Sequence, residues 1–347
     1  MKRKKRILLL LSGTQKYGGI QSFNNNLIQS LSKYELRILD FNDSSTENIK
    51  GFESDKTGFF ISALKGVISR PDIIIIGHLH FILLSFFARL LRVKTVTILH
   101  GIEAWTPKKS IIKYLKFVDR YWAVSQFTRR KFIEFSRIKS DKVDLIFNTL
   151  PHSWPLNSVP VADQKKILTI ARLDKLDGYK GVDTILKALA GLKQDLKKDQ
   201  WKYDIVGSGS DLERHKGLAL ALGLAEIVNF HEKVDQEAIE SLLSSCSFFV
   251  LPSGGEGFGI VYLEAMSFKK AVLGASDSGA EEVIVDGKTG FLVEPSVEEI
   301  KEKIRLLIIS PEKRRLFGEE GYKRLNEKFS FELFNNKINK LISECVV

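Results

Sequence analysis

Short apolar runs alternate with segments of helical spacing along the whole chain. In the first half, six apolar runs indicate buried strands, at residues 6–13, 36–41, 72–77, 94–101, 120–125 and 142–148. The segments between them, such as 20–34 and 110–119, carry apolar residues at helical spacing. Continuous apolar strands joined by crossover helices are typical of a parallel, doubly wound sheet, so the pattern predicts an α/β fold.

The segment 148–164 interrupts this alternation, because it contains three prolines and no apolar periodicity. A second series of apolar runs follows, at residues 166–173, 202–209, 227–232, 247–253 and 270–276. A chain of 347 residues also fits two domains of about 150 residues better than one core. The sequence therefore predicts two Rossmann-like domains, residues 1–160 and 161–330, with a C-terminal helix at 331–347.

Two stretches imitate export or membrane segments. Residues 1–13 combine a basic start with an apolar run, but the run Ile7 to Leu11 has only five residues and no small-residue cleavage site follows. We interpret it as a first buried strand. The most apolar stretch, residues 71–93, contains two histidines and two arginines, His78, His80, Arg89 and Arg92, so it predicts a buried strand at 73–76 and an amphipathic helix rather than a membrane span.

Composition is that of a soluble globular protein, with 44% hydrophobic and 27% charged residues. The two cysteines, Cys246 and Cys345, lie far apart in apolar surroundings. They indicate buried thiols in a reducing compartment and not a disulfide framework.

Charge is distributed unevenly. Residues 1–160 contain 26 basic and 12 acidic residues, a net charge of +14, whereas residues 161–347 carry a net charge of −3. A basic first half indicates an anionic partner, for which anionic lipid and nucleic acid are both candidates; a generally basic proteome is the alternative explanation. No recognised nucleic-acid-binding module is present, so we expect no nucleic-acid partner.

Several second-half strands end in residues suited to a nucleotide. Arg172 follows one strand, and Lys180 lies eight residues further on in a turn. Two cations at the carboxyl edge of a sheet suit a diphosphate, because arginine offers a fork of donors and lysine a point charge. Gly207 and Gly209 lie in a strand-to-helix turn, where a missing side chain lets the backbone approach a ligand.

The stretch VLPSGGEGFGIVYLEAM, residues 250–266, ends a strand, turns through glycines and opens a helix near Gly259. Backbone amides at a helix start favour an anion. Glu256 precedes these amides and Glu264 lies inside the helix. Carboxylates repel phosphate but accept hydrogen bonds from sugar hydroxyls, so the two acids predict contacts to the two sugars of a nucleotide-sugar.

An ordered set of seven segments resembles the retaining GT-B glycosyltransferases of family four, often called group 1. The segments are YGGIQSF, HGIEAW, ARL…YKG, VGSG, NFHEKV, EGFGIVYLEA and GKTGFLVEP. The resemblance covers nearly the whole chain and is strongest at residues 165–295. It implies two domains facing across a cleft, with the C-terminal helix packing back on the first. The combination of two glutamates eight positions apart with the upstream Arg172 and Lys180 is specific to this family.

The resemblance also implies roles in the second domain. Arg172 and Lys180 would bind the diphosphate, Glu256 the donor-sugar hydroxyls and Glu264 the ribose. Backbone contacts would come from Phe258, Gly259 and Ile260, and contacts to the base from Val234. The stretch from Arg172 to Lys180 is longer than the commonest family pattern, which leaves Lys175 as the alternative to Lys180.

In the first domain, the family pattern places Gly18 and Gly19 in a loop that approaches the donor phosphates. His100 would touch the donor sugar or the reacting centre; a capping or packing histidine is the alternative. Glu103 and Trp105 beside it are candidate acceptor contacts. We interpret His78 and His80 as structural, because no further ligand cluster accompanies them.

The resemblance implies a retaining hexosyltransferase. The chain contains no Asp-x-Asp pair, so we expect the enzyme to be metal-independent. The donor, a UDP- or GDP-linked sugar, is a substrate, so no cofactor is expected. The expected acceptor is a glycan or lipid-linked saccharide of cell-surface polysaccharide or glycolipid synthesis. We expect a cytoplasmic enzyme, peripheral at the inner face of the cytoplasmic membrane. A sugar-nucleotide epimerase, a phosphorylase and a non-catalytic donor-binding subunit are the alternatives.

Overall fold

The computed structural model describes residues 3–15, 18–155 and 164–345. The chain forms two compact units: Met1–Ser153 with Phe329–Val347, and Trp154–Lys328. The predicted boundary at residue 160 lies outside the described residues, and the structure ends the first unit's main segment at Ser153.

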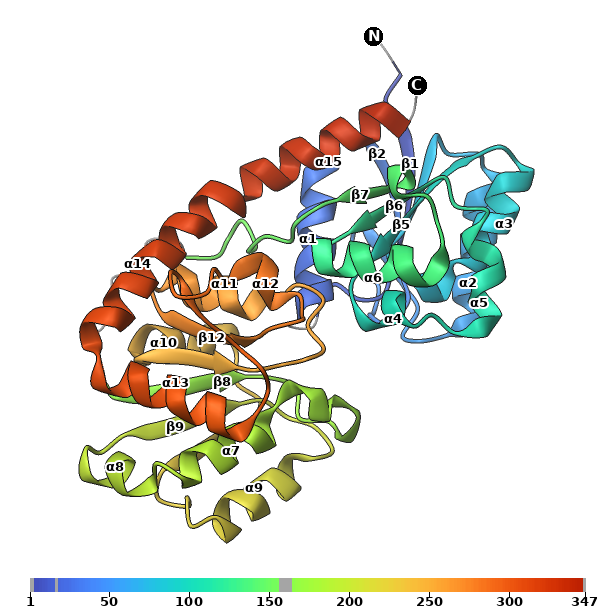
Figure 1. Ribbon diagram of the computed structural model, residues 1–347. Coiled ribbons are helices and arrows are strands. Elements are labelled where there is room, and N and C mark those ends of the chain that lie inside the picture. Colours follow the sequence, from blue (N-terminus) through green and yellow to red (C-terminus); the bar gives the residue numbers. More distant parts are fainter. Residues whose placement is uncertain (1–2, 16–17, 156–163, 346–347) are drawn as a thin grey trace. The chain divides into compact units, whose positions relative to one another are not determined.

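Within the described residues, the first unit contains a seven-stranded parallel sheet in the order β3-β2-β1-β4-β5-β6-β7 (Figure 1). Its strands are β1 Arg6–Leu11, β2 Glu35–Asp40, β3 Ile49–Gly51, β4 Ile73–Ile76, β5 Lys94–Leu99, β6 Arg120–Ala123 and β7 Val143–Leu145. Its helices are α1 Gly19–Ser30, α2 Lys56–Ile68, η1 Leu79–Phe81, α3 Leu83–Leu90, α4 Ile102–Trp105, α5 Lys109–Leu115, α6 Gln126–Ser136, η2 Ser140–Lys142 and α15 Phe331–Cys345.

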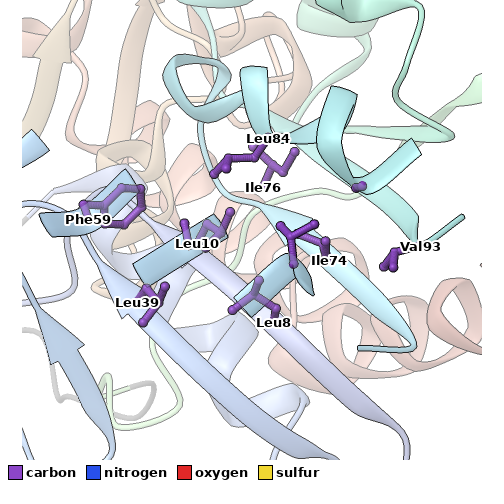
Figure 2. Close-up of a cluster of buried hydrophobic side chains, with 11 residues drawn as sticks. Leu8, Leu10, Leu39, Phe59, Ile74, Ile76, Leu84 and Val93 are labelled. Carbon is purple, nitrogen blue, oxygen red and sulfur yellow. The ribbon is translucent and has the colours of Figure 1, made fainter. Parts of the chain in front are cut away.

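The central strands of this sheet are apolar on both faces because helices cover both. Every residue of β4 is buried, as expected for the run of four isoleucines. Figure 2 shows the cluster in which Leu8, Leu10, Ile74 and Ile76 of the sheet pack against α2 and α3. The apolar run at 7–11 is a buried strand and residues 73–90 form a strand followed by helices, which confirms both predictions.

The second unit contains a six-stranded parallel sheet in the order β10-β9-β8-β11-β12-β13, again counting described residues. Its strands are β8 Lys166–Ile170, β9 Lys202–Val206, β10 Val228–His231, β11 Phe248–Leu251, β12 Ala271–Ala275 and β13 Gly290–Val293. Its helices are η3 Lys175–Lys180, α7 Val182–Ala190, α8 Lys193–Lys198, α9 Leu212–Ala221, α10 Gln236–Ser245, α11 Ile260–Ser267, α12 Ala280–Val283, α13 Val297–Ile309 and α14 Pro311–Lys328.

Both sheets have the strand order of a doubly wound fold, which confirms the predicted fold class. The order reverses between β1 and β4 in the first unit and between β8 and β11 in the second. Loops that leave the carboxyl ends of these two strand pairs diverge, and ligands of such sheets bind there.

The pattern missed the two edge strands β3 and β13, which are short and contain glycine. The C-terminal helix α15 belongs to the first unit and packs against α1 (Figure 1). Cys246 is buried and Cys345 is half-buried, and both are free thiols. None of the helices in the described ranges is long and apolar enough to cross a bilayer.

Candidate active site

The predicted diphosphate residues lie at the reversal point of the second sheet. Arg172 follows β8, and Glu256 lies in the loop that follows the neighbouring strand β11. Lys180 ends the turn η3, which comes directly after the Arg172 loop. Three of the four residues predicted to act in catalysis therefore share one sheet edge.

Arg172 is held by a carboxylate that the sequence analysis did not single out. Its Nε and Nη2 atoms both donate to Asp177, the latter over 2.9 Å, and Asp174 lies 3.6 Å from Nε. The hydrogen bonds to Asp177 raise the pKa of Arg172 above its usual value. The arginine side chain is 65% exposed although Asp177 is only 5% exposed, so the guanidinium still faces solvent.

Lys180 donates a hydrogen bond to Oε1 of Glu256, and the two side chains are only 19% and 12% exposed. Lysine has three donors and a carboxylate has two acceptor oxygens, so this pair leaves capacity on both partners for a ligand. Gly181 fits the turn against the next loop: its φ is +77°, and a Cβ there would lie 2.8 Å from the carbonyl oxygen of Pro252. The structure thus brings Lys180 and Glu256 into contact.

The helix α11 starts where the sequence predicted, with Gly259 as its N-cap at φ +87°. A Cβ on Gly259 would lie 2.4 Å from the ring of Tyr262, whose hydroxyl donates to the carbonyl of Leu251 over 2.6 Å. Phe258 and Ile260 are 4% and 7% exposed. Because their side chains are buried, these two residues could offer a ligand chiefly backbone groups, as the family resemblance implies.

Glu264 lies on α11 and is only 1% exposed. Its backbone carbonyl accepts a hydrogen bond from Ser267 over 2.7 Å. The carboxylate therefore belongs to the interior of the unit and presents little surface to a ribose. Contact with the ribose stays a prediction.

Gly207 and Gly209 bring two loops together. A Cβ at Gly207 would lie 1.9 Å from the carbonyl oxygen of Ala171, and one at Gly209 would lie 2.3 Å from the carbonyl of Leu173. The missing side chains thus make room for the backbone of the Arg172 loop. The predicted approach of a ligand to this turn stays a prediction. Val234 lies partly buried in the loop after β10, the edge strand of the same sheet.

The remaining predicted residues belong to the first unit. Gly18 precedes α1 and Gly19 begins it, in the loop that follows β1. Polar side chains of α1, which were not predicted to have this role, hydrogen-bond to the backbone of this loop. Asn24 and Asn25 of α1 donate to the carbonyls of Gly13 and Thr14 over 2.7 and 2.9 Å. A run of three asparagines on an otherwise amphipathic helix was the available signal.

His100 follows β5 and is held on several sides. Its Nε2 lies 2.9 Å from the carbonyl oxygen of Gly77, and its ring meets Phe23 edge-on at 5.3 Å. Burial lowers the pKa of His100 although Glu103 and the bond to Gly77 oppose this. A neutral imidazole that donates from Nε2 keeps Nδ1 as an acceptor, which suits a sugar hydroxyl.

The two candidate acceptor contacts are occupied within the unit. Oε1 of Glu103 accepts hydrogen bonds from the backbone N–H of His100 and Gly101 over 2.7 and 3.1 Å. The indole of Trp105 donates to Thr128 over 3.3 Å. Glu103 therefore stabilises the turn after β5, and Trp105 connects α4 to α6.

His78 and His80 interact with each other. The backbone N–H of His80 donates to Nδ1 of His78 over 3.2 Å, and burial lowers the pKa of His78 to about 4. In the part of the chain that the structure describes, no group of three or more His, Cys, Asp or Glu side chains could hold a metal ion.

Two family profiles match the chain. The profile described as Glycosyl transferases group 1 matches residues 157–324, and that described as Glycosyltransferase Family 4 matches residues 48–153. An uncharacterized glycosyltransferase of Methanocaldococcus jannaschii is 26% identical over 94% of this chain and 95% of the relative. The alpha-1,3/1,6-mannosyltransferase of Dictyostelium discoideum is 28% identical over 54% of this chain; the match spans about half, 48%, of that relative's length.

Solved structures show the same fold at low sequence identity. HepE of Anabaena in complex with UDP and glucose has a TM-score of 0.83 at 19% identity, over 98% of this chain and 100% of that one. The lipopolysaccharide outer core galactosyltransferase WaaB has a TM-score of 0.75 at 18% identity, over 98% and 99%. Together the two profiles match most of the chain, which belongs to the GT-B glycosyltransferases of family four.

Proposed function

We propose that this glycosyltransferase moves a hexose, with retention of anomeric configuration, from a UDP- or GDP-linked sugar to a glycan or lipid-linked saccharide. The observation that carries the proposal is the pair of cations, Arg172 and Lys180, at the reversal point of the second sheet. They lie in one short segment, and Lys180 contacts Glu256. The complex of the Anabaena neighbour with UDP and glucose supports a UDP-linked donor.

The proposed chemistry needs no covalent nucleophile. The bond between the anomeric carbon and the diphosphate oxygen breaks, and the acceptor oxygen bonds to the same face of that carbon. The acceptor proton passes to the departing phosphate oxygen. Arg172, Lys180 and the amides at the start of α11 stabilise the charge that develops on the diphosphate. No step in this scheme requires a metal ion.

Residues of the first unit complete the proposal. The neutral His100 would accept a hydrogen bond from a donor-sugar hydroxyl through Nδ1. The backbone at Gly18 and Gly19 would approach the diphosphate, because the loop after β1 is the one that the family pattern assigns to it.

We further propose a peripheral enzyme at the cytoplasmic membrane surface, with an acceptor held in the membrane. Four exposed lysines, here called the α5 lysines, lie on and beside α5: Lys108, Lys109, Lys113 and Lys116. The apolar residues of the same segment, Ile111, Ile112 and Tyr114, pack against the cluster beneath it. Binding to anionic lipid would therefore be electrostatic, at about 1 kcal/mol for each lysine near the surface.

A donor screen tests the proposed function. Purified protein is incubated with each common UDP-, GDP- and ADP-sugar, and slow hydrolysis and thermal stabilisation are measured. One donor should stabilise the protein and be hydrolysed. Arg172→Ala and Lys180→Ala should each lower turnover about a hundredfold, because each removes a charge-assisted contact to the leaving group. Lys198→Ala, an exposed lysine of α8, is the control.

Three results would contradict the proposal. Near-normal turnover by both variants would show that the diphosphate binds elsewhere. Conversion of the donor to an epimer without an acceptor would favour an epimerase. Donor binding without hydrolysis, and without transfer to any saccharide acceptor tested, would favour a non-catalytic subunit.

A further inference from the structure

The turn between Arg172 and Lys180 is built around a buried acid. Asp177 is 5% exposed and lies on η3, the turn that ends at Lys180. A buried carboxylate is costly unless it is paired and hydrogen-bonded. A buried acid at this position therefore needs partners within the site.

Asp177 is bound by the guanidinium of Arg172 and lies near the hydroxyl of Tyr179. The guanidinium of Arg172 donates two parallel hydrogen bonds to it, from Nε to Oδ2 and from Nη2 to Oδ1. The nearby hydroxyl of Tyr179 also lowers the pKa of Asp177. Burial raises the pKa of Asp177, but the bonds from Arg172, the hydroxyl of Tyr179 and the nearby charges outweigh it and leave the pKa below its usual value.

Tyr179 connects this acid to the loop that carries Glu256. Its carbonyl accepts a hydrogen bond from the backbone N–H of Gly254 over 3.0 Å. Its ring covers Gly255 so closely that a Cβ there would lie 2.3 Å from a ring carbon. The next residue, Lys180, binds Glu256 itself. One short turn thus connects the two cations to the glycine loop.

We propose that Asp177 and Tyr179 are positioning residues for the donor diphosphate, with Asp177 fixing the guanidinium of Arg172 and Tyr179 fixing the turn that carries Asp177 against the glycine loop. This inference rests on the proposed function, because it assigns Arg172 to the diphosphate. An arginine has five N–H donors, and Asp177 takes two of them. The remaining donors lie on the exposed part of the side chain, already oriented before the ligand arrives.

Orientation before binding matters most for the rate. Donors that are aligned before the reaction stabilise developing charge without reorganisation. Loss of Asp177 should therefore lower kcat more than it raises KM for the donor.

The test is a double-mutant cycle with the donor found in the screen. Asp177→Asn cannot accept two parallel hydrogen bonds from a guanidinium, and it should lower kcat about tenfold to hundredfold. Tyr179→Phe keeps the ring over Gly255 and removes only the hydroxyl, and it should lower kcat several-fold. Asp195→Asn, an exposed acid on α8, should leave kcat unchanged.

In the Arg172→Ala background, Asp177→Asn and Tyr179→Phe should change kcat by less than about twofold, because the group that they position is absent. Unfolding by urea identifies any variant that fails to fold; Tyr179→Phe, the milder change, then decides the question alone. In Asp177→Asn and Tyr179→Phe, the affinity for the nucleoside diphosphate, measured by calorimetry, should change by less than about threefold. This is the result expected when a side chain loses its orientation and not its contact with the ligand.

Two outcomes overturn the positioning role while leaving the proposed function intact. If the effects of Asp177→Asn and Arg172→Ala multiply, Asp177 supports the fold and not the arginine. If Asp177→Asn turns over as fast as the wild type or faster, the carboxylate either plays no part or competes with the diphosphate. If the wild-type protein neither binds nor hydrolyses any nucleotide-sugar, the proposed function and this inference fail together.

Discussion

A single methyl group at Gly279 should displace the loop that carries Glu256. Gly279 has φ −62° and ψ −11°, which alanine adopts without strain. Its N–H donates to the carbonyl of Glu256 over 2.7 Å. A Cβ there would lie 2.4 Å from the carbonyl of Gly257 and 2.6 Å from that of Glu256, where ordinary contacts begin at 3.4 Å. Because these neighbours are backbone atoms, the loop has to move by about 1 Å.

A displacement of this size should be costly for catalysis and tolerable for folding. Overpacking of this kind costs about 1–3 kcal/mol of stability. A misplacement of about 1 Å in an active site can lower the rate about a hundredfold. We therefore expect Gly279→Ala to fold, to unfold at a lower urea concentration, and to lose about two orders of magnitude in kcat with the donor found in the screen.

Gly254→Ala is the matched control, since it lies in the same loop as Glu256 and no atom lies within 4 Å of its Cβ position. It should keep kcat within about twofold of the wild type. If Gly279→Ala is as active as the wild type, the position of the Glu256 loop does not limit transfer, and our assignment of Glu256 to the donor sugar loses its support. Equal losses in both variants would show that the loop tolerates no change, and the steric argument would fail.

Three further predictions concern other parts of the molecule. Calorimetry with the nucleoside diphosphate alone should show weaker binding for Glu264→Gln but not for Glu256→Gln, since only the ribose belongs to that ligand; equal losses would remove the distinction. Flotation with anionic vesicles should show binding that fades with salt and is lost when the α5 lysines are neutralised, whereas salt-insensitive binding or none would indicate an acceptor outside the membrane. The pKa of His78 falls from 6.5 to about 4 on folding, so the unfolded chain binds the proton first as the pH drops. As the pH drops from about 7 to 5, the free energy of unfolding should therefore fall by about 2 kcal/mol because of His78. Urea titration should show a smaller fall in His78→Gln and the same fall as in the wild type in the exposed control His152→Gln.

The sequence predicted the fold because its signals are local and repeated. Runs such as the four isoleucines of β4 are apolar throughout, which a strand tolerates only when both faces are covered. The edge strands β3 and β13 escaped this reasoning because they are short and contain glycine. Their position in the sheet depends on pairing with β2 and β12, which the local pattern does not reveal.

The candidate site was predictable to a different extent. Arg172 and Glu256 could be placed at one sheet edge, because parallel strands end together and each residue lies in the segment that follows an apolar run. Their partners could not be predicted, since a contact depends on side-chain direction and on how a turn closes. Glu103 shows this limit: its position beside His100 indicated an acceptor contact, which stays a prediction, but did not reveal that its Oε1 accepts hydrogen bonds from two backbone N–H groups.

Asp177 shows why some functional candidates emerge only from the structure. In the sequence it is one of two acids in a charged turn, and an exposed acid so close to Arg172 and Lys180 would weaken a diphosphate site by repulsion. The structure buries Asp177 and leaves Arg172 exposed, so the acid neutralises one side of the guanidinium while the other side stays available. A buried anion of this kind accepts two of the arginine's five N–H donors and orients the others toward solvent, which suits a site for a highly charged leaving group.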